Sequence, residues 1–315
     1  MEKDSAIFIT GGNGMVGRSL IKRLQKEGYT NLLPPNSKEL DLRDKKKVFE
    51  YVKKNNIHYV LHLAARVGGI QENIKRPAEF LYENLEMQNN VIEASRQYKI
   101  KKLLFLGSSC IYPTECPQPM MEEHLLSGKL EPTNEGYALA KISGLKLCEY
   151  YNKQYGTNFI CLMPPNLYGP NDHFDLKRSH VISALITKFH NAKENNESFV
   201  EVWGSGKARR EFLYVEDIAD AILFFMNNYD SSELPPFVNV GSGKDVSIAE
   251  LVETIKEVVG YTGKIRFDTT KPDGMMKKLI DSDKAKALGW SAKTDLRRGL
   301  EETYRWYKEN KRHEA

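Results

Sequence analysis

Three side chains have the types and spacing needed to move a proton on an alcohol or a ketone. Tyr137 and Lys141 are four residues apart, so on a helix they share one face. A lysine ammonium beside a tyrosine favours the phenolate and lowers the tyrosine pKa, which suits the phenol to general acid–base work. Ser108 stands at the end of an apolar run, and from there its hydroxyl can hydrogen-bond the oxygen of the alcohol or ketone on which Tyr137 acts. We interpret the three as catalytic, although a surface lysine near a half-buried tyrosine gives the same spacing.

A glycine-rich turn near the N-terminus predicts a dinucleotide site. Gly11, Gly14 and Gly17 follow an apolar run and precede a helical pattern. Glycines at such a turn allow a tight bend, close approach of the backbone to a pyrophosphate, and close contact between helix and sheet. The free N–H groups of the helix N-terminus then face the phosphates. The alternative is an ordinary strand–helix turn that needs glycine for its own packing.

The elements that must position these residues alternate in type along the first half of the chain. Short apolar runs at 6–10, 59–63, 102–107 and 159–163 predict strands, and the segments at 16–27, 78–98 and 137–155 predict helices. This alternation predicts an α/β fold with a Rossmann-type, doubly wound parallel sheet.

After residue 165 the pattern becomes irregular. We expect a loop at 166–175, helices at 180–193 and 248–259, and short strands at 201–203, 211–214 and 237–240. The sequence therefore predicts two domains. A dinucleotide-binding domain takes residues 1–165 with about 214–240, and a smaller α/β substrate-binding domain takes about 166–213 and 241–315.

The segment after the second strand bears on the choice between NAD and NADP. An acidic residue there holds the ribose 2′-hydroxyl of NAD, whereas a basic one suits a 2′-phosphate. Here Ser37 and Lys38 come before any acid, so we predict NADP(H). Asp41 is expected either near the adenine, with Leu42, or as a helix N-cap, and Asp44 is an equal candidate for the cap.

The composition excludes several other classes of protein. The formal net charge is +4 with the two signs mixed along the chain, so no basic tail indicates nucleic acid. No apolar run reaches the roughly 18 residues of a membrane span, and the strand-like segment at the N-terminus leaves no room for a secretory signal. The chain has four cysteines, too few for a disulfide scaffold and without the pairing of a zinc site. We expect a cytoplasmic protein without a metal.

Several motifs together resemble one enzyme family. Residues 10–17 (TGGNGMVG), 63–65 (LAA), 107–109 (GSS) and 137–141 (YALAK) occur in the order typical of the extended short-chain dehydrogenase/reductase family. More specific segments, among them 65–70 (ARVGGI), 107–113 (GSSCIYP), 166–170 (NLYGP) and 271–274 (KPDG), resemble the GDP-L-fucose synthase branch of that family. The resemblance runs from about residue 7 to residue 306.

This resemblance implies two activities in one site, for which GDP-4-keto-6-deoxy-D-mannose is the substrate. Protons are exchanged at C3 and C5, and NADPH then reduces the C4 ketone. Cys110 matches the family's base and His180 its acid, while Ser108 and Tyr137 hold the C4 oxygen in both stages. The other three cysteines, Cys116, Cys148 and Cys161, are predicted to be loop or core residues.

The resemblance also assigns residues to the two ligands. The predicted cofactor-binding residues are Gly11, Asn13, Gly14, Met15, Val16, Gly17, Ser37, Lys38, Asp41, Leu42, Leu63, Ala64, Ala65, Lys141, Pro164, Asn166, Leu167 and His180. The predicted substrate-binding residues are Lys188, Trp203, Arg210 and Lys278. Trp203 is equally a core aromatic at a strand end. A homodimer through the 78–98 and 137–155 helices is expected from the same resemblance.

Two alternatives stay open. One is a related reductase or epimerase that acts on another 4-keto sugar nucleotide. Cys110 together with His180 argues against a simple reductase, and a 4,6-dehydratase would need a glutamate in the 110–112 segment. The other is a catalytically silent regulator that binds NADP on the same fold, against which the intact Ser108, Tyr137 and Lys141 argue.

Overall fold

A parallel six-stranded sheet forms the centre of the larger lobe. The computed structural model describes residues 1–175, 179–271 and 273–311. The strand order is β2-β1-β3-β4-β5-β9, and every neighbouring pair is parallel. The strands are β1 (Ile7–Thr10), β2 (Leu32–Leu33), β3 (Tyr59–His62), β4 (Lys102–Leu106), β5 (Phe159–Met163) and β9 (Val238–Asn239). The strands that follow β1 in sequence, β2 and β3, lie on opposite sides of it, which is typical of a doubly wound sheet. The predicted Rossmann-type sheet is therefore confirmed.

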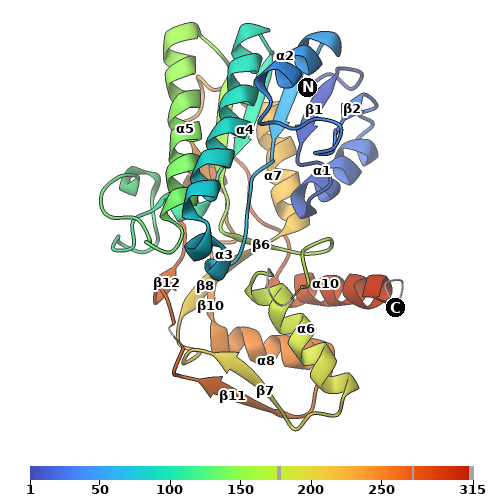
Figure 1. Cartoon of the computed structure of the whole chain (residues 1–315), viewed down its shortest axis with the longest axis vertical. Coiled ribbons are helices and arrows are strands. Elements are labelled where there is room, and N and C mark those ends of the chain that lie inside the picture. Colours follow the sequence, from blue (N-terminus) through green and yellow to red (C-terminus); the bar gives the residue numbers. More distant parts are fainter. Residues whose placement is uncertain (176–178, 272, 312–315) are drawn as a thin grey trace.

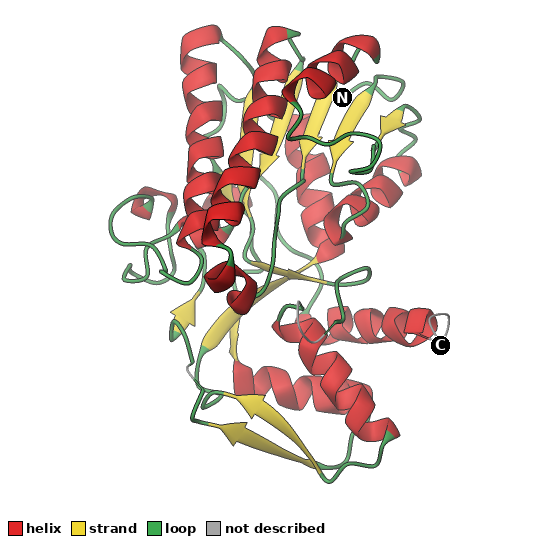
Figure 2. Cartoon of the chain, viewed as in Figure 1, coloured by secondary structure: helices red, strands yellow, loops and turns green. Residues whose placement is uncertain are grey.

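Helices cover both faces of this sheet (Figures 1 and 2). Alternate strand residues divide between two cores: Ile9 and Leu104 belong to the core that includes α1 and α7, whereas Phe8 and Phe105 belong to the core that includes α2, α4 and α5. Burial on both faces explains why these strands read as continuous apolar runs. The helices are α1 (Met15–Lys26), α2 (Lys45–Lys54), α4 (Pro77–Gln97), α5 (Glu135–Tyr155) and α7 (Val215–Asn228).

The smaller lobe lies beyond the carboxyl ends of the strands (Figure 1). Its central strand β8 pairs with β6 and β12 in parallel and with β10 antiparallel, while β7 pairs with β11. The strands are β6 (Asn166–Tyr168), β7 (Phe199–Trp203), β8 (Arg209–Tyr214), β10 (Asp245–Ser247), β11 (Lys264–Asp268) and β12 (Lys277–Lys278). The helices are α6 (Val181–Glu194), α8 (Ile248–Val259), α9 (Asp283–Ala287) and α10 (Leu296–Lys311).

One element contradicts the sequence-based expectation. The segment 166–175 was expected to be a loop, but its first three residues form β6. Their partner is β8, more than forty residues later, with Asn166 opposite Phe212. A three-residue strand is too short to show a period of two. Its hydrogen-bond partners also come from a distant segment, so the local sequence does not indicate the pairing.

Short helical segments complete the connections between these elements. They are α3 (Ile70–Lys75) and two 3-10 turns, η1 (Ser109–Ile111) and η2 (Glu122–His124). Within the ranges that the structure describes, no helix is long and apolar enough to cross a bilayer.

Candidate active site

The glycine turn between β1 and α1 has the shape that a pyrophosphate needs. Gly11 has φ +71°, and a Cβ there would lie 2.9 Å from the Ala64 nitrogen. A Cβ on Gly17 would lie 2.2 Å from the Gly11 carbonyl oxygen. Both glycines are therefore required by packing within the turn.

Gly14 faces a more open space. It is the N-cap of α1, it contributes no side-chain hydrogen bond to the helix, and a Cβ there would meet only the Gly11 oxygen, at 3.4 Å. The backbone N–H groups at this helix start, from Met15 and Val16 onward, thus have room for an anion in front of them. The open cradle at Gly14 fits the phosphates of a dinucleotide.

A buried threonine–histidine pair supports the floor of this cradle. The Thr10 hydroxyl accepts hydrogen bonds from the N–H groups of Leu63 and Ala64, each 3.2 Å long, and lies 2.8 Å from His62 Nδ1. Burial lowers the pKa of His62 to about 3, so the ring is neutral. The pair joins the ends of β1 and β3 and so positions the predicted 63–65 loop. Sequence reasoning missed this pair, although polar residues ending two apolar strands are a usable signal.

The adenosine end of the predicted cofactor site lies beyond β2. Ser37 and Lys38 are exposed there, and the Lys38 N–H is held by the Asn36 side chain at 2.9 Å. Asp44, whose carboxylate accepts from the Lys47 N–H, is the N-cap of α2.

Asp41 is therefore not the N-cap of α2, and its carboxylate binds another group. Its carboxylate binds the Arg43 guanidinium, with Nη2 2.8 Å from Oδ2, and this hydrogen bond lowers the pKa of Asp41. The adjacent Leu42 carbonyl accepts from Asn90. These contacts leave the position of Asp41 beside the adenine as the remaining prediction for this residue.

Ser108 and Tyr137 meet at the carboxyl end of β4. Ser108 is the first residue of the turn that leads into η1, and its hydroxyl accepts from the Cys110 N–H at 3.3 Å. Tyr137 lies in the first turn of α5, and the side chains of Ser108 and Cys110 both lie close enough to its phenol to influence its pKa. Three of the predicted catalytic residues, Ser108, Cys110 and Tyr137, are thus brought together in one place.

Lys141 differs from the expectation. Its side chain is 2% exposed, and its Nζ donates to the Leu106 carbonyl at 2.9 Å, beside the Phe105 ring. Burial lowers the pKa of Lys141 to about 8 and raises the pKa of Tyr137. The expected lowering of the tyrosine pKa by Lys141 is therefore wrong for this structure, because burial of the phenol and the neighbouring Cys110 raise that pKa.

Cys110 lies between two hydrogen-bond donors from different segments. Asn134 Nδ2 is 3.4 Å from its sulfur, and Lys278 Nζ is 3.7 Å from the same atom. Lys278 was predicted at the GDP end, so its contact with Cys110 was not anticipated. The other cysteines follow the prediction, since Cys148 and Cys161 are buried and Cys116 is partly buried in a loop.

The predicted GDP residues form two groups on the smaller lobe. On β8, Arg210 donates to the carbonyls of Met275 and Asp273, and burial lowers the pKa of its guanidinium. On β7, the Trp203 ring is 57% exposed, and the ammonium groups of Lys188 and Lys271 each lie 5.7 Å from its centroid. An exposed indole flanked by cations is not a core aromatic, and it suits an anionic, flat ligand.

The remaining predicted residues lie in the part of the chain that runs from the end of β5 to the start of α6. His180 is exposed at the N-cap of α6. The Pro164 carbonyl accepts from the Ser109 N–H at 2.9 Å, Asn166 begins β6 and donates to the Glu211 carbonyl, and Leu167 is partly buried. Among the described residues, no group of three His, Cys, Asp or Glu side chains is placed to hold a metal ion.

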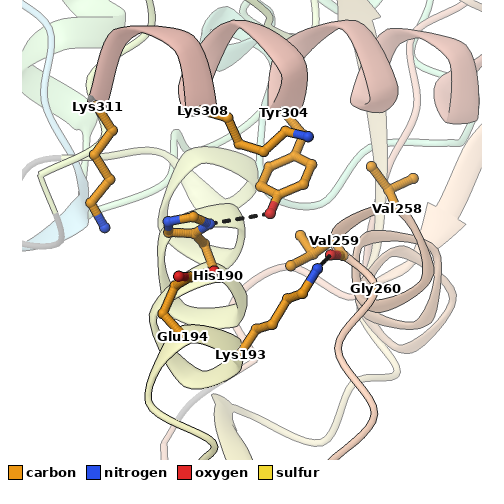
Figure 3. A pocket seen from close by; sticks show the side chains of 9 residues that line it. All are labelled: His190, Lys193, Glu194, Val258, Val259, Gly260, Tyr304, Lys308 and Lys311. Carbon is orange, nitrogen blue, oxygen red and sulfur yellow. Dashed lines mark hydrogen bonds between the residues drawn. The ribbon is translucent and has the colours of Figure 1, made fainter. Parts of the chain in front are cut away.

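A cavity of about 500 Å³ lies away from all of these residues (Figure 3). It is lined by the C-terminal turns of α6, α8 and α10, and its lysines include Lys193, which donates to the Val259 carbonyl at 2.8 Å. Lysines at helix C-termini donate hydrogen bonds to the free carbonyls there and interact favourably with the helix dipoles. We therefore interpret this cavity as a packing feature and place the site at the carboxyl edge of the sheet.

Comparison with known proteins identifies the family of the chain. The model of the NAD dependent epimerase/dehydratase family matches residues 7–241. The chain belongs to this family. GDP-L-fucose synthase 1 of Arabidopsis thaliana is 49% identical over 98% of the chain and 95% of the relative. GDP-L-fucose synthase of Escherichia coli K12 is 46% identical over 96% of the chain and 97% of the relative. The predicted resemblance to this branch of the family is confirmed.

Two solved structures of the family have the same fold. A GDP-6-OMe-4-keto-L-xylo-heptose reductase from C. jejuni superposes with a TM-score of 0.95, at 38% identity over 98% of this chain and 99% of that one. A GDP-L-fucose synthetase from Naegleria fowleri bound to NADP superposes with a TM-score of 0.91, at 32% identity over 99% and 95%. The family members thus share both the fold and nearly the full length of the chain.

Proposed function

We propose that this chain converts GDP-4-keto-6-deoxy-D-mannose into GDP-L-fucose with NADPH, by 3,5-epimerisation followed by reduction of the C4 ketone. The observation that carries the proposal is the meeting of Ser108, Cys110 and Tyr137 at one point on the carboxyl edge of the sheet. The proposal is also supported by relatives that match nearly the whole chain and are named GDP-L-fucose synthase. The sheet lobe (1–165 with about 214–240) holds the cofactor, and the remaining segments hold the GDP-sugar.

The chain's own residues fit NADP(H). The cradle at Gly14 receives the pyrophosphate, and Ser37 with Lys38 receives the 2′-phosphate. Asp41 and Leu42 would lie on the adenine side of the cofactor, and Lys141 would lie on its nicotinamide side. When bound, the cofactor supplies a hydride to the C4 carbon.

Epimerisation uses the acidity that the 4-keto group confers on its neighbours. The Cys110 thiolate takes the proton from C3 or C5, which leaves an enolate whose oxygen lies between Ser108 and Tyr137. His180 returns a proton to the opposite face of the same carbon. The configuration is thereby inverted without any change in oxidation state.

Reduction reuses the same oxygen site. Tyr137 donates its proton to the C4 oxygen as the hydride reaches the carbon, and Ser108 keeps that oxygen in place. A tyrosine whose pKa is raised by burial is protonated at neutral pH, and so it is ready to act as the acid. One oxyanion site can therefore serve both stages.

The GDP portion extends over the smaller lobe. Arg210 and Lys188 provide positive charge for the diphosphate, and the exposed Trp203 ring gives the nucleotide or sugar an aromatic surface. Arg210 is held by three backbone carbonyls, so its fork is oriented before the ligand arrives.

We also propose a homodimer through α4 and α5. These two long helices lie side by side on the outside of the sheet (Figure 1), and they expose Tyr82, Leu139, Tyr150 and Tyr155. A set of exposed large side chains on neighbouring helices suits a self-complementary interface. Light scattering should give twice the chain mass, and a Leu139→Glu variant should give the single mass.

The decisive experiment mixes the chain with NADPH and GDP-4-keto-6-deoxy-D-mannose. We expect oxidation of NADPH, with GDP-L-fucose as the product. A GDP-6-deoxysugar in which C3 and C5 are not inverted would instead favour a reductase, as in the heptose reductase of similar fold. Binding of NADPH without any turnover would favour a silent regulator.

A further inference from the structure

The Cys110 sulfur faces an arrangement of donors that matches a thiolate better than a thiol. Asn134 Nδ2 lies 3.4 Å away and Lys278 Nζ 3.7 Å away. An ammonium can only donate, and the NH₂ group of the Asn134 amide likewise donates. Two donors directed at one sulfur stabilise the charged acceptor, because hydrogen bonds to the ionised form favour that form.

The ammonium is held in this place by the backbone around it. Lys278 pairs with Arg210 across β12 and β8. Two residues later, the Ile280 N–H donates to the buried Glu211 carboxylate at 3.0 Å. The Leu279 carbonyl accepts from the Met120 N–H at 2.8 Å, which joins this segment to the stretch that follows Cys110.

The neighbouring lysine provides a natural comparison. Lys277 is exposed and pairs with Asp245 at 3.4 Å, because alternate residues of a strand point to opposite sides. The other groups that the structure places against Cys110, the Ser108 hydroxyl and the Tyr137 phenol, are neutral near pH 7. Among the residues that the structure describes, Lys278 is the cation whose side chain lies against this sulfur.

We propose that Lys278, assisted by Asn134, is a positioning residue that keeps Cys110 as the thiolate base, and is not a ligand of the GDP diphosphate. This inference rests on the proposed function for its catalytic meaning. In the step concerned, the C–H bond of C3 or C5 breaks, its proton forms the S–H bond of Cys110, and the electron pair passes into the enolate. The ammonium of Lys278 keeps its own proton throughout.

The first test measures the thiolate directly, in the whole chain without substrate. Iodoacetamide alkylates Cys110 at a rate set by its thiolate fraction, which mass spectrometry of the peptide follows in a Cys116→Ser background. An opposite charge within about 4–6 Å changes the ionisation equilibrium at least tenfold. Lys278→Met should therefore slow alkylation near pH 7 by about tenfold. Lys278→Arg should restore most of the rate, and Lys277→Met should leave it unchanged.

The second test separates the two possible roles of Lys278. Lys278→Met should slow the uptake of solvent deuterium at C3 and C5 about tenfold while leaving the Kd for GDP unchanged. Unchanged alkylation with weakened GDP binding would overturn the proposal in favour of a diphosphate ligand. Should the Met variant fail to fold by circular dichroism, Lys278→Gln takes its place, with the same criteria. Failure of the unmodified chain to turn over the keto sugar would refute the proposed function, whereas the alkylation ratio would still decide the role of Lys278.

Discussion

Replacement of Lys141 by methionine should make the protein more stable and inactive at once. The lysine is 2% exposed, and burial alone lowers its pKa from 10.5 to about 8. At about 1.36 kcal/mol for each pKa unit, charging this group in the folded state costs about 3 kcal/mol. Loss of the hydrogen bond to the Leu106 carbonyl returns about 1 kcal/mol. The net gain in the free energy of unfolding near pH 7 is therefore about 2 kcal/mol.

The pH dependence of this gain follows from the direction of the shift. The pKa of Lys141 is lower in the folded state than in the unfolded state, so between about pH 8 and 10.5 the unfolded chain binds the extra proton. The cost of the buried charge is full below about pH 8 and fades as the pH rises toward 10.5. The advantage of Lys141→Met should thus be largest at neutral pH and close to zero near about pH 9.5.

Thermal unfolding followed by circular dichroism measures this gain. Lys141→Met should raise Tm by about 4 °C near pH 7 and lower turnover by about 100-fold or more. Lys146→Met is the matched control, because Lys146 is on the same helix, partly exposed and paired with Glu149, so its Tm should change by less than about 2 °C. A fall in Tm for Lys141→Met, or an equal rise in Tm at about pH 7 and about pH 9.5, would show that desolvation of Lys141 does not set the stability difference.

Three further predictions concern the cofactor cradle and the interior. Gly14→Ala should leave Tm unchanged and weaken NADP binding about tenfold or more, as seen by calorimetry, whereas Gly17→Ala should destabilise the fold itself because its Cβ would lie 2.2 Å from a carbonyl oxygen. Lys38→Ala should raise KM for NADPH several-fold and leave KM for NADH unchanged; equal effects on both would argue against a contact with the 2′-phosphate. Burial raises the pKa of Glu211 to about 7, so its stabilising contribution is full below about pH 4.5 and is lost as the pH rises through about 7. Between about pH 5 and 8 the Tm of the parent should fall, while Glu211→Gln should show a flatter profile.

The parts of the fold that sequence predicts well are those determined by local pattern. The first strand, the glycine turn and α1 follow one another within twenty residues, and each has its own signal of burial, turn chemistry or helical spacing. The four-residue spacing of Tyr137 and Lys141 similarly requires only a helix. These features could be predicted because each depends on neighbours in the chain.

The features that sequence does not predict depend on distant partners. The contact between Lys278 and Cys110 joins residues 168 positions apart, and no local pattern records it. The hydrogen bond from Lys141 to the Leu106 carbonyl forms because the side chain is buried against β4, and the spacing of Tyr137 and Lys141 alone does not predict that burial. The family resemblance supplied the identity of the site residues, but the structure was needed to show which of them touch one another.

The central claim is that one pocket carries out both epimerisation and reduction, and a single measurement tests it. GDP-4-keto-6-deoxy-D-mannose is incubated in deuterated solvent with Cys110→Ser and with Tyr137→Phe, each with NADPH, and the products are followed by NMR. We predict that Cys110→Ser loses deuterium uptake at C3 and C5 yet still reduces the C4 ketone, giving a product without inversion. Tyr137→Phe should take up deuterium more slowly, because Ser108 alone then holds the enolate oxygen, and should consume NADPH about 100-fold more slowly. Full retention of deuterium uptake and of GDP-L-fucose formation by Cys110→Ser would contradict the account.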